Sequence, residues 1–153
     1  MKSYNNIRKI ENIDKLTKLR KIFFAGNKIS KIENLENQTE LSMLELGANR
    51  IRKIENLDKN LKLGEIFLGK NKIEKIENLD SLSELSLLDV QACRVQKIDG
   101  ISNLQNLSSL HLSHNQIKVI ENIDKNTALD TIDLSGNPIE KLAGKVQGLI
   151  FRF

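Results

Sequence analysis

The sequence contains few of the residues on which secreted, membrane-spanning and metal-binding proteins depend. Its 153 residues include one cysteine, one proline and two histidines. A single cysteine cannot form a disulfide within the chain, and it fits a reducing compartment. No stretch approaches the run of about 18 apolar residues that a membrane span needs. We therefore expect no membrane-spanning segment.

The N-terminal segment also lacks the features of a secretory leader. Its first residues, MKSYNNIRKIENIDK, contain no apolar run of the roughly 7–15 residues found in signal peptides. Together with the lone cysteine, this predicts a protein of the nucleus and cytoplasm.

Composition predicts one folded domain with a mildly basic surface. Charged residues make up 29% of the chain and apolar residues 39%, and the formal net charge is +4. A chain of this length and composition can bury a core. The charges of both signs are interspersed, so the net charge allows contact with nucleic acid without arguing for it. We expect no direct nucleic-acid partner.

One repeat of 22 residues runs through the chain. A half repeat covers residues 5–18, and an irregular tail covers residues 143–153. Repetition at this period indicates a solenoid, and we interpret residues 1–153 as one repeat domain. Six full copies begin at Leu19, Leu41, Leu63, Leu85, Leu107 and Leu129.

Each copy follows the pattern L-x-x-L-x-L-x-x-N/C-x-L, which is typical of leucine-rich repeats. Its first, fourth and sixth residues, such as Leu63, Ile66 and Leu68, are predicted to face inward from a short strand. Later residues such as Ile73 and Ile76 would fill the opposite wall. The predicted fold is an α/β-class leucine-rich-repeat solenoid. It is a curved horseshoe with short parallel strands on the concave face, and with 3₁₀ or extended backbone on the convex side.

Asparagine recurs at the ninth position of the repeat. In a solenoid this position is buried, and its amide can bond backbone groups of adjacent coils. Cys93 occupies the same position in one coil. We interpret it as a structural substitute for asparagine rather than a nucleophile, because a nucleophilic cysteine needs a nearby base and a site that favours the thiolate. The asparagines are Asn5, Asn27, Asn49, Asn71, Asn115 and Asn137.

The sequence offers no catalytic set, metal site or cofactor site. The two histidines, His111 and His114, are predicted on the concave face and at a strand end, and no cysteine or carboxylate is phased beside both to complete four ligands. No serine–histidine–aspartate set and no phosphate-binding glycine loop is present. We therefore predict a protein that is not an enzyme.

Two further segments have alternative interpretations. KIFF, residues 21–24, matches a short motif by which phosphatase partners dock, but Ile22 and Phe24 fall at core positions, so we interpret the match as accidental. The tail contains several apolar residues, which would cap the last coil or dock against a partner. These are Val146, Leu149, Ile150, Phe151 and Phe153.

The concave face is the predicted binding surface, because repeat proteins bind through equivalent positions of successive coils. Apolar and aromatic side chains alternate there with acids, as in protein interfaces. The acids argue against contact with a phosphate backbone. The candidate residues are Phe23, Glu45, Phe67, Asp89, His111 and Asp133 at the fifth position, with Met43, Glu65 and Leu87 at the third.

Across residues 5–142, the repeats resemble those of the leucine-rich-repeat family of protein phosphatase 1 regulatory subunit 7. The similarity lies in LELGANRIRKIENLD, IFLGKNKIEKIENLD and LHLSHNQIKVIE. It implies a nuclear and cytoplasmic protein whose concave aromatic and acidic residues contact the phosphatase catalytic subunit. Phe23, Glu45 and Phe67 match contact positions by motif. The family has more repeats and a dedicated C-terminal cap.

Three hypotheses of function follow. The first is a monomeric scaffold that binds the catalytic subunit of type-1 serine/threonine phosphatase. The second is a ribonucleoprotein adaptor, like the leucine-rich subunit of the spliceosomal U2 particle, which holds an RNA-binding protein. The third is a bacterial surface adhesin of the internalin kind, against which the missing signal peptide argues.

Overall fold

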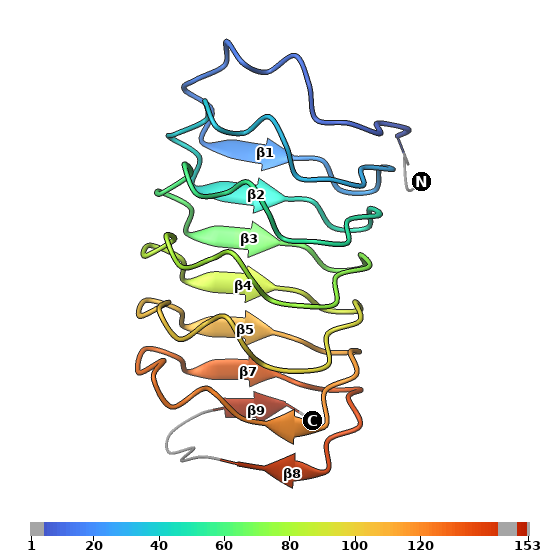
Figure 1. The fold of residues 1–153 in the computed structure, drawn as a ribbon, viewed down its shortest axis with the longest axis vertical. Helices are drawn as coiled ribbons and strands as arrows, with labels where there is room; N and C mark the ends of the chain where they lie inside the picture. The colour runs from blue at the N-terminus through green and yellow to red at the C-terminus, as the bar shows by residue number, and fades with distance from the viewer. Residues whose placement is uncertain (1–4, 144–149, 153) are drawn as a thin grey trace.

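The computed structural model describes residues 5–143 and 150–152. Seven parallel strands form one sheet in the order β1-β2-β3-β4-β5-β7-β9, and β6 pairs with β8 in a second sheet (Figure 1). The strands of the large sheet are β1 (Lys21–Phe23), β2 (Met43–Glu45), β3 (Glu65–Phe67), β4 (Leu87–Asp89), β5 (Ser109–His111), β7 (Thr131–Asp133) and β9 (Ile150–Arg152). The small sheet consists of β6 (Val119–Ile120) and β8 (Lys141–Leu142).

The register of the sheet follows the repeat. Ile22 pairs with Leu44, and Leu44 pairs in turn with Ile66, so each step along the sheet advances by one repeat. Equivalent residues therefore stack in straight rows across the strands. We number the coils by their repeats, so that coil 1 begins at residue 19, coil 2 at residue 41 and coil 6 at residue 129.

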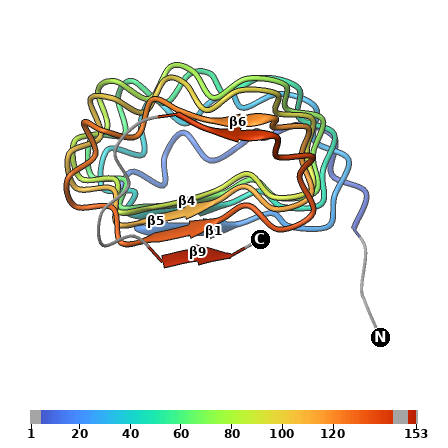
Figure 2. The same cartoon turned by 90° about the horizontal axis from the view of Figure 1, so that it is seen from below.

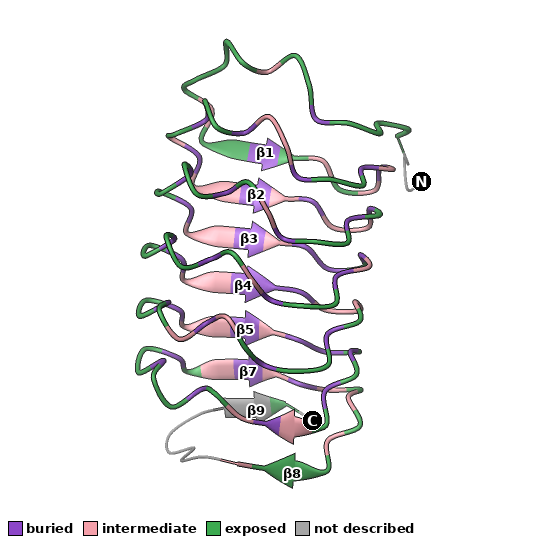
Figure 3. Ribbon diagram, in the orientation of Figure 1, coloured by how far each residue is buried: buried purple, intermediate pink, exposed green. Residues whose placement is uncertain are grey.

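The core lies between two walls of this stack. Seen along the stack, the large sheet forms one wall and the segment containing β6 forms the other (Figure 2). In the large sheet, the central residue of each strand from β1 to β7 is buried, and its neighbours are less buried except in β4, where Asp89 is buried too (Figure 3). Leu63, Ile66 and Leu68 are fully buried, as predicted. Phe24, predicted as core, is only partly buried, although it packs against the core cluster.

The wall opposite the sheet is extended rather than helical. No helix occurs in the part of the chain that the structure describes. The described residues therefore contain no helix that could cross a membrane. Single turns reverse the chain instead. The N–H of Gln38 donates to the carbonyl of Leu35 at 3.1 Å, and the N–H of Leu41 donates to that of Gln38 at 3.1 Å. Of the two predicted conformations for the convex side, the extended one dominates.

The ninth-position asparagines join consecutive coils. Asn49 Oδ1 accepts a hydrogen bond from the N–H of Ile29 at 3.0 Å, and its Nδ2 donates to the carbonyls of Phe24 and Leu46, both at 2.9 Å. Asn71 repeats these bonds one coil further on. One buried amide thus satisfies backbone groups of its own coil and the coil before it, as the sequence predicted.

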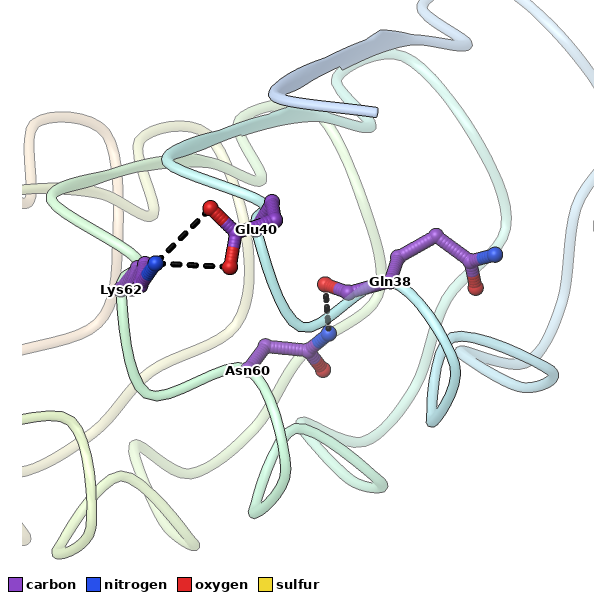
Figure 4. A network of polar contacts seen from close by, with 4 residues as sticks. All are labelled: Gln38, Glu40, Asn60 and Lys62. Atoms are coloured by element: carbon purple, nitrogen blue, oxygen red, sulfur yellow. Dashed lines mark hydrogen bonds and ion pairs between the residues drawn. The ribbon is translucent and has the colours of Figure 1, made fainter. Parts of the chain in front are cut away.

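Two further rows of amides reinforce the opposite wall. Asn56 has a φ of +59° and donates from Nδ2 to the carbonyl of Ile32 at 2.7 Å. Asn60, in the next row, donates to the carbonyl of Gln38 at 3.0 Å (Figure 4). On the surface nearby, Lys62 pairs with Glu40 at 2.6 Å. This exposed ion pair contributes little, whereas the buried amide bonds set the spacing of the coils.

Coil 4 departs from two of these rows. Cys93 stands in the ninth-position row, half-buried, with its Sγ 3.5 Å from the carbonyl of Leu68. Gly100, with a φ of +67°, replaces the asparagine of the second row. A Cβ there would lie 2.3 Å from the carbonyl oxygen of Ile76, so the two backbones approach too closely for a side chain.

The described part of the tail extends the large sheet. β9 lies parallel to β7, with Asp133 paired to Arg152. Its backbone therefore covers the last regular strand, as a cap would. The apolar residues Val146, Leu149 and Phe153 lie outside the described residues.

Replacing a ladder asparagine should destabilise the fold strongly. Asn49→Ala leaves a buried N–H and two buried carbonyls without the side-chain partner, so we expect a loss of about 3 kcal/mol in the free energy of unfolding. Cys93→Asn should raise that free energy by about 1 kcal/mol, because an amide can make bonds that the thiol makes weakly. Urea denaturation measures both. Asn37→Ala, at an exposed asparagine, is the control and should change little.

Cys93 should react slowly with thiol reagents. Burial raises the pKa of its thiol, although the N–H groups of Asn71 and Ile73 act in the opposite direction. Because only the thiolate is nucleophilic, labelling of the native protein should be about tenfold or more slower than labelling in denaturant. A Cys93→Ala variant carrying Ser30→Cys, at an exposed site, supplies the fast control. Equal rates at the two positions would contradict the structural role.

Candidate protein-binding face

The outward side of the large sheet, which we call the sheet face, presents one continuous row at the fifth repeat position. The strand register places each member directly beside the next. Neighbouring strands lie about 4.8 Å apart, so the side chains form an uninterrupted strip. Ring and carboxylate alternate at every step, in the order Phe23, Glu45, Phe67, Asp89, His111 and Asp133.

The three carboxylates bend back onto the backbone two residues later. Glu45 Oε1 accepts the N–H of Gly47 at 2.6 Å, and Asp89 Oδ1 accepts the N–H of Gln91 at 2.8 Å. Asp133 Oδ1 does the same with Ser135 at 3.0 Å. These bonds hold each carboxylate against the sheet, so the acids form a rigid surface rather than a solvated fringe.

Exposure varies along the row. Phe23 is the most open, at 65% exposed, whereas Asp89 is only 9% exposed. The sequence placed Asp89 on this face without anticipating its burial. Its second oxygen accepts a further bond from Gln91 Nε2 at 3.1 Å, which covers the carboxylate. The other candidates are half-buried, namely Glu45, Phe67, His111, Asp133, Met43, Glu65 and Leu87.

A small hollow of about 160 Å³ opens in the middle of the sheet face. Phe67 and Gly69 lie in its lining, between Glu45 of the preceding coil and Asp89 of the following one. A Cβ at Gly69 would lie 2.8 Å from Cγ of Gln91, so only glycine leaves this space open. Lys70 also lies in the lining, and both oxygens of Asp89 are already bonded to Gln91. The ring of Phe67 beside the carboxylate of Glu45 is therefore the part that suits the cationic tip of a lysine or arginine.

Two residues that shape this hollow, Gly69 and Gln91, were not among the binding residues predicted from the sequence. Both stand at the seventh repeat position. The signal was available, since glycine occupies that position in coils 2 and 3, beside the acid–ring–acid stretch.

The local environment shifts two carboxylates in opposite directions. Burial raises the pKa of Glu45, and the charge of Asp89 adds to this effect, while the bond from Gly47 opposes it. For Asp133, burial also acts upward, but hydrogen bonds from Ser135 and the nearby His111 and Arg152 outweigh it and lower the pKa. A cationic partner would therefore stabilise the charged form of Glu45, as His111 and Arg152 already do for Asp133.

The histidines lie apart from any metal-binding arrangement. His111 lies on the sheet face, and His114, exposed with a φ of +55°, follows at the strand end. Among the described residues, no group of three or more histidine, cysteine, aspartate or glutamate side chains could hold a metal ion.

A larger hollow, of about 680 Å³, lies on the opposite wall where Gly100 interrupts the second asparagine row. Its lining mixes acids, lysines and amides such as Glu77, Lys97 and Gln96. Asp99 is already bonded to the N–H of Gly100, at 2.9 Å. We interpret this hollow as a consequence of the missing asparagine, because Gly100 lies in its lining. The lining brings no catalytic group beside a base.

Comparison with known proteins agrees with this geometry. The family model described as Leucine Rich repeats (2 copies) matches residues 105–145. An internalin of Listeria monocytogenes is similar in structure, with a TM-score of 0.79 at 28% identity over 94% of this chain and 46% of that one. The chain has the leucine-rich-repeat fold.

Two further leucine-rich-repeat structures are similar. The functional domain of InlJ from Listeria monocytogenes, which includes a cysteine ladder, has a TM-score of 0.76 at 25% identity over 90% of this chain and 29% of that one. A leucine-rich-repeat protein of Leptospira interrogans has a TM-score of 0.82 at 21% identity, over 92% and 38% respectively.

The present chain spans less than half the length of each of these three structures. No curated protein sequence matches it. The leucine-rich-repeat fold is typically a scaffold for protein interaction, and this supports a protein-binding role at the level of the fold.

Neutralising Glu45 should stabilise the protein in a pH-dependent manner. Because its pKa is raised on folding, the folded state binds more protons than the unfolded state above the ordinary glutamate pKa. Stability is therefore lost as pH rises through this range. Glu45→Gln should be at least as stable as wild type at pH 7, and this advantage should disappear near pH 4. Urea denaturation at both pH values measures it, with Glu36→Gln as an exposed control.

Proposed function

We propose that this chain is a protein-binding scaffold whose sheet face engages the catalytic subunit of type-1 serine/threonine phosphatase. The single observation that carries the proposal is the row of alternating rings and carboxylates along the fifth repeat position. A row held by strand pairing is rigid before binding, so a partner meets a surface that needs little further ordering.

The centre of the proposed interface is the hollow at Phe67. Its ring is half-buried and flanked by Glu45 and Asp89. A basic side chain entering here would contact the ring face and the carboxylate of Glu45 together. Energetic hot spots occur where an anchor fills such a central, desolvated pocket. Phe23, at 65% exposed, would add apolar contact at the N-terminal end of the row.

The choice of a phosphatase rests on the resemblance of the repeats, with Phe23, Glu45 and Phe67 at the matching positions. On the same ground we propose a nuclear and cytoplasmic location, no enzymatic activity of the chain itself, and a monomer before binding. Antibody staining of cells that express the tagged chain tests the location.

A second candidate is an internalin-like bacterial surface adhesin. The observation that favours it is the structural similarity to two Listeria monocytogenes proteins, at 28% and 25% identity. It uses the same sheet face, so the two candidates differ in the partner rather than in the site. Capture of the phosphatase catalytic subunit separates them.

Phe67→Ala should weaken binding of the purified phosphatase catalytic subunit about 30-fold, which corresponds to about 2 kcal/mol for a hot-spot residue. Glu45→Lys should weaken it by a similar factor, because it places a cation where the partner supplies one. Surface plasmon resonance measures the dissociation constants.

Glu36→Lys is the matched control, since it makes the same change of charge at an exposed residue away from the strands. Its affinity should stay within about twofold of wild type. If wild type fails to bind the catalytic subunit, the phosphatase proposal is wrong. If all four proteins bind equally, the partner is right and the sheet face is not the site.

A further inference from the structure

Among the described residues, no strand lies beside the outer edge of the first strand, β1. The backbone N–H and C=O groups of alternate residues in this segment point toward β2. The carbonyl of Arg20 accepts the N–H of Met43 at 3.1 Å, and the N–H of Phe24 donates to the backbone carbonyl of Glu45 at 2.8 Å. The N–H and C=O groups of Lys21 and Phe23 therefore point the other way. Within the described residues no strand lies on that side of β1, and none of those residues supplies a backbone partner for these groups.

The half repeat does not cover this edge. Apart from the turn bond between Leu19 and Leu16, the bonds seen between the described half repeat and coil 1 fall beyond the strand. Examples are the N–H of Lys28 to the carbonyl of Ile7 at 2.8 Å and Asn34 Nδ2 to that of Ile10 at 2.6 Å. Figure 1 shows β1 as the outermost strand at the N-terminal end of the stack. The opposite wall is covered there, while the sheet wall is open.

The approach to this edge is basic. We call Lys15, Lys18, Arg20 and Lys21 the basic lead-in; all four are exposed, and none joins an ion pair among the described residues. Asp14 is the one acid between residues 14 and 23. Arg20 also lies near Glu40, which already pairs with Lys62. Most of the positive charge of the basic lead-in is therefore available to a binding partner.

Apolar surface accompanies this charge. Leu16 is 51% exposed beside a hollow of about 340 Å³ formed by residues 15–19, and Phe23 is 65% exposed on the strand itself. An extended chain lying along β1 would meet a cation at Lys21 and a ring at Phe23, because alternate residues of a strand share a face.

We propose that the free edge of β1 binds an extended acidic segment of another protein, which adds to the sheet as an eighth strand. Main-chain bonds to Lys21 and Phe23 give the geometry, and the basic lead-in selects acidic sequences. This site borders the sheet-face interface and shares Phe23 with it, but it does not depend on the phosphatase proposal.

A second copy of the chain fits this edge poorly. Pairing β1 with another β1 would bring two basic lead-ins together, and the opposite end of the sheet carries the exposed Arg152 on β9. Like charges in both arrangements oppose self-association. Nucleic acid would satisfy the charge but could not reproduce the main-chain bonding of a strand.

Fluorescence anisotropy with a labelled eight-residue peptide of alternating glutamate and valine tests the proposal. We expect saturable binding that weakens as NaCl rises, and no binding of the lysine–valine counterpart. A glutamate–valine peptide methylated at alternate backbone nitrogens keeps its charge but loses edge bonding, so it should bind at least about tenfold more weakly.

Two variants separate edge pairing from charge. Lys21→Pro and Lys21→Gln both remove one charge, but only proline removes the edge N–H, and proline is tolerated at the start of an edge strand. We expect about a threefold loss for Lys21→Gln and at least about a tenfold loss for Lys21→Pro. Thermal melting confirms that both fold. Lys18→Glu should weaken binding, and Lys53→Glu, the matched exposed control, should not.

Hydrogen exchange supplies a readout that charge alone would not change. The amides of Lys21 and Phe23 should be protected in the peptide complex and not in the free protein. Equal affinity of Lys21→Pro and Lys21→Gln, or binding without this protection, would overturn edge addition. Tighter binding of a 12-mer of deoxythymidine than of the peptide would assign the basic lead-in to nucleic acid, and concentration-dependent dimers by light scattering would assign the edge to a second copy.

Discussion

The structure depends on the buried amide of the ninth-position asparagine. One side chain accepts the N–H of the coil before it and donates to carbonyls of both coils, as Asn49 does with Ile29, Phe24 and Leu46. A 22-residue coil without a helix has many backbone groups and few internal partners for them. The asparagine row satisfies these groups and fixes the distance between coils, and the strand register follows from that distance.

The order of the side chains along the sheet face follows from this register. Because each coil advances by one repeat, residues that are 22 apart in sequence become neighbours, and a ring falls beside a carboxylate at every step. Glycine at the seventh position then allows Glu45 to bend onto the N–H of Gly47 and leaves a hollow beside Phe67. The candidate interface thus arises from the same repetition that builds the core.

Departures from the repeat identify the places where the molecule differs from an ideal stack. Cys93 and Gly100 both lie in coil 4 and weaken two amide rows at its junction with coil 3. At the N-terminal end of the stack, the half repeat bonds to the wall opposite the sheet, and among the described residues no strand lies beside the outer edge of β1. The irregular positions are therefore as informative about binding surfaces as the regular ones.

The sequence alone determined the solenoid, its strands and the rows of the sheet face, because a fixed period and a two-residue alternation leave one arrangement that buries every leucine-type position. It also placed Cys93 in the asparagine row. Only the tertiary structure decided how far each side chain is exposed. The burial of Asp89 depends on Gln91 folding over it. Phe24 is only partly buried, although the equivalent residues of the following coils, such as Leu46, are fully buried. Such features arise from contacts between coils, which a repeat pattern aligns but does not describe.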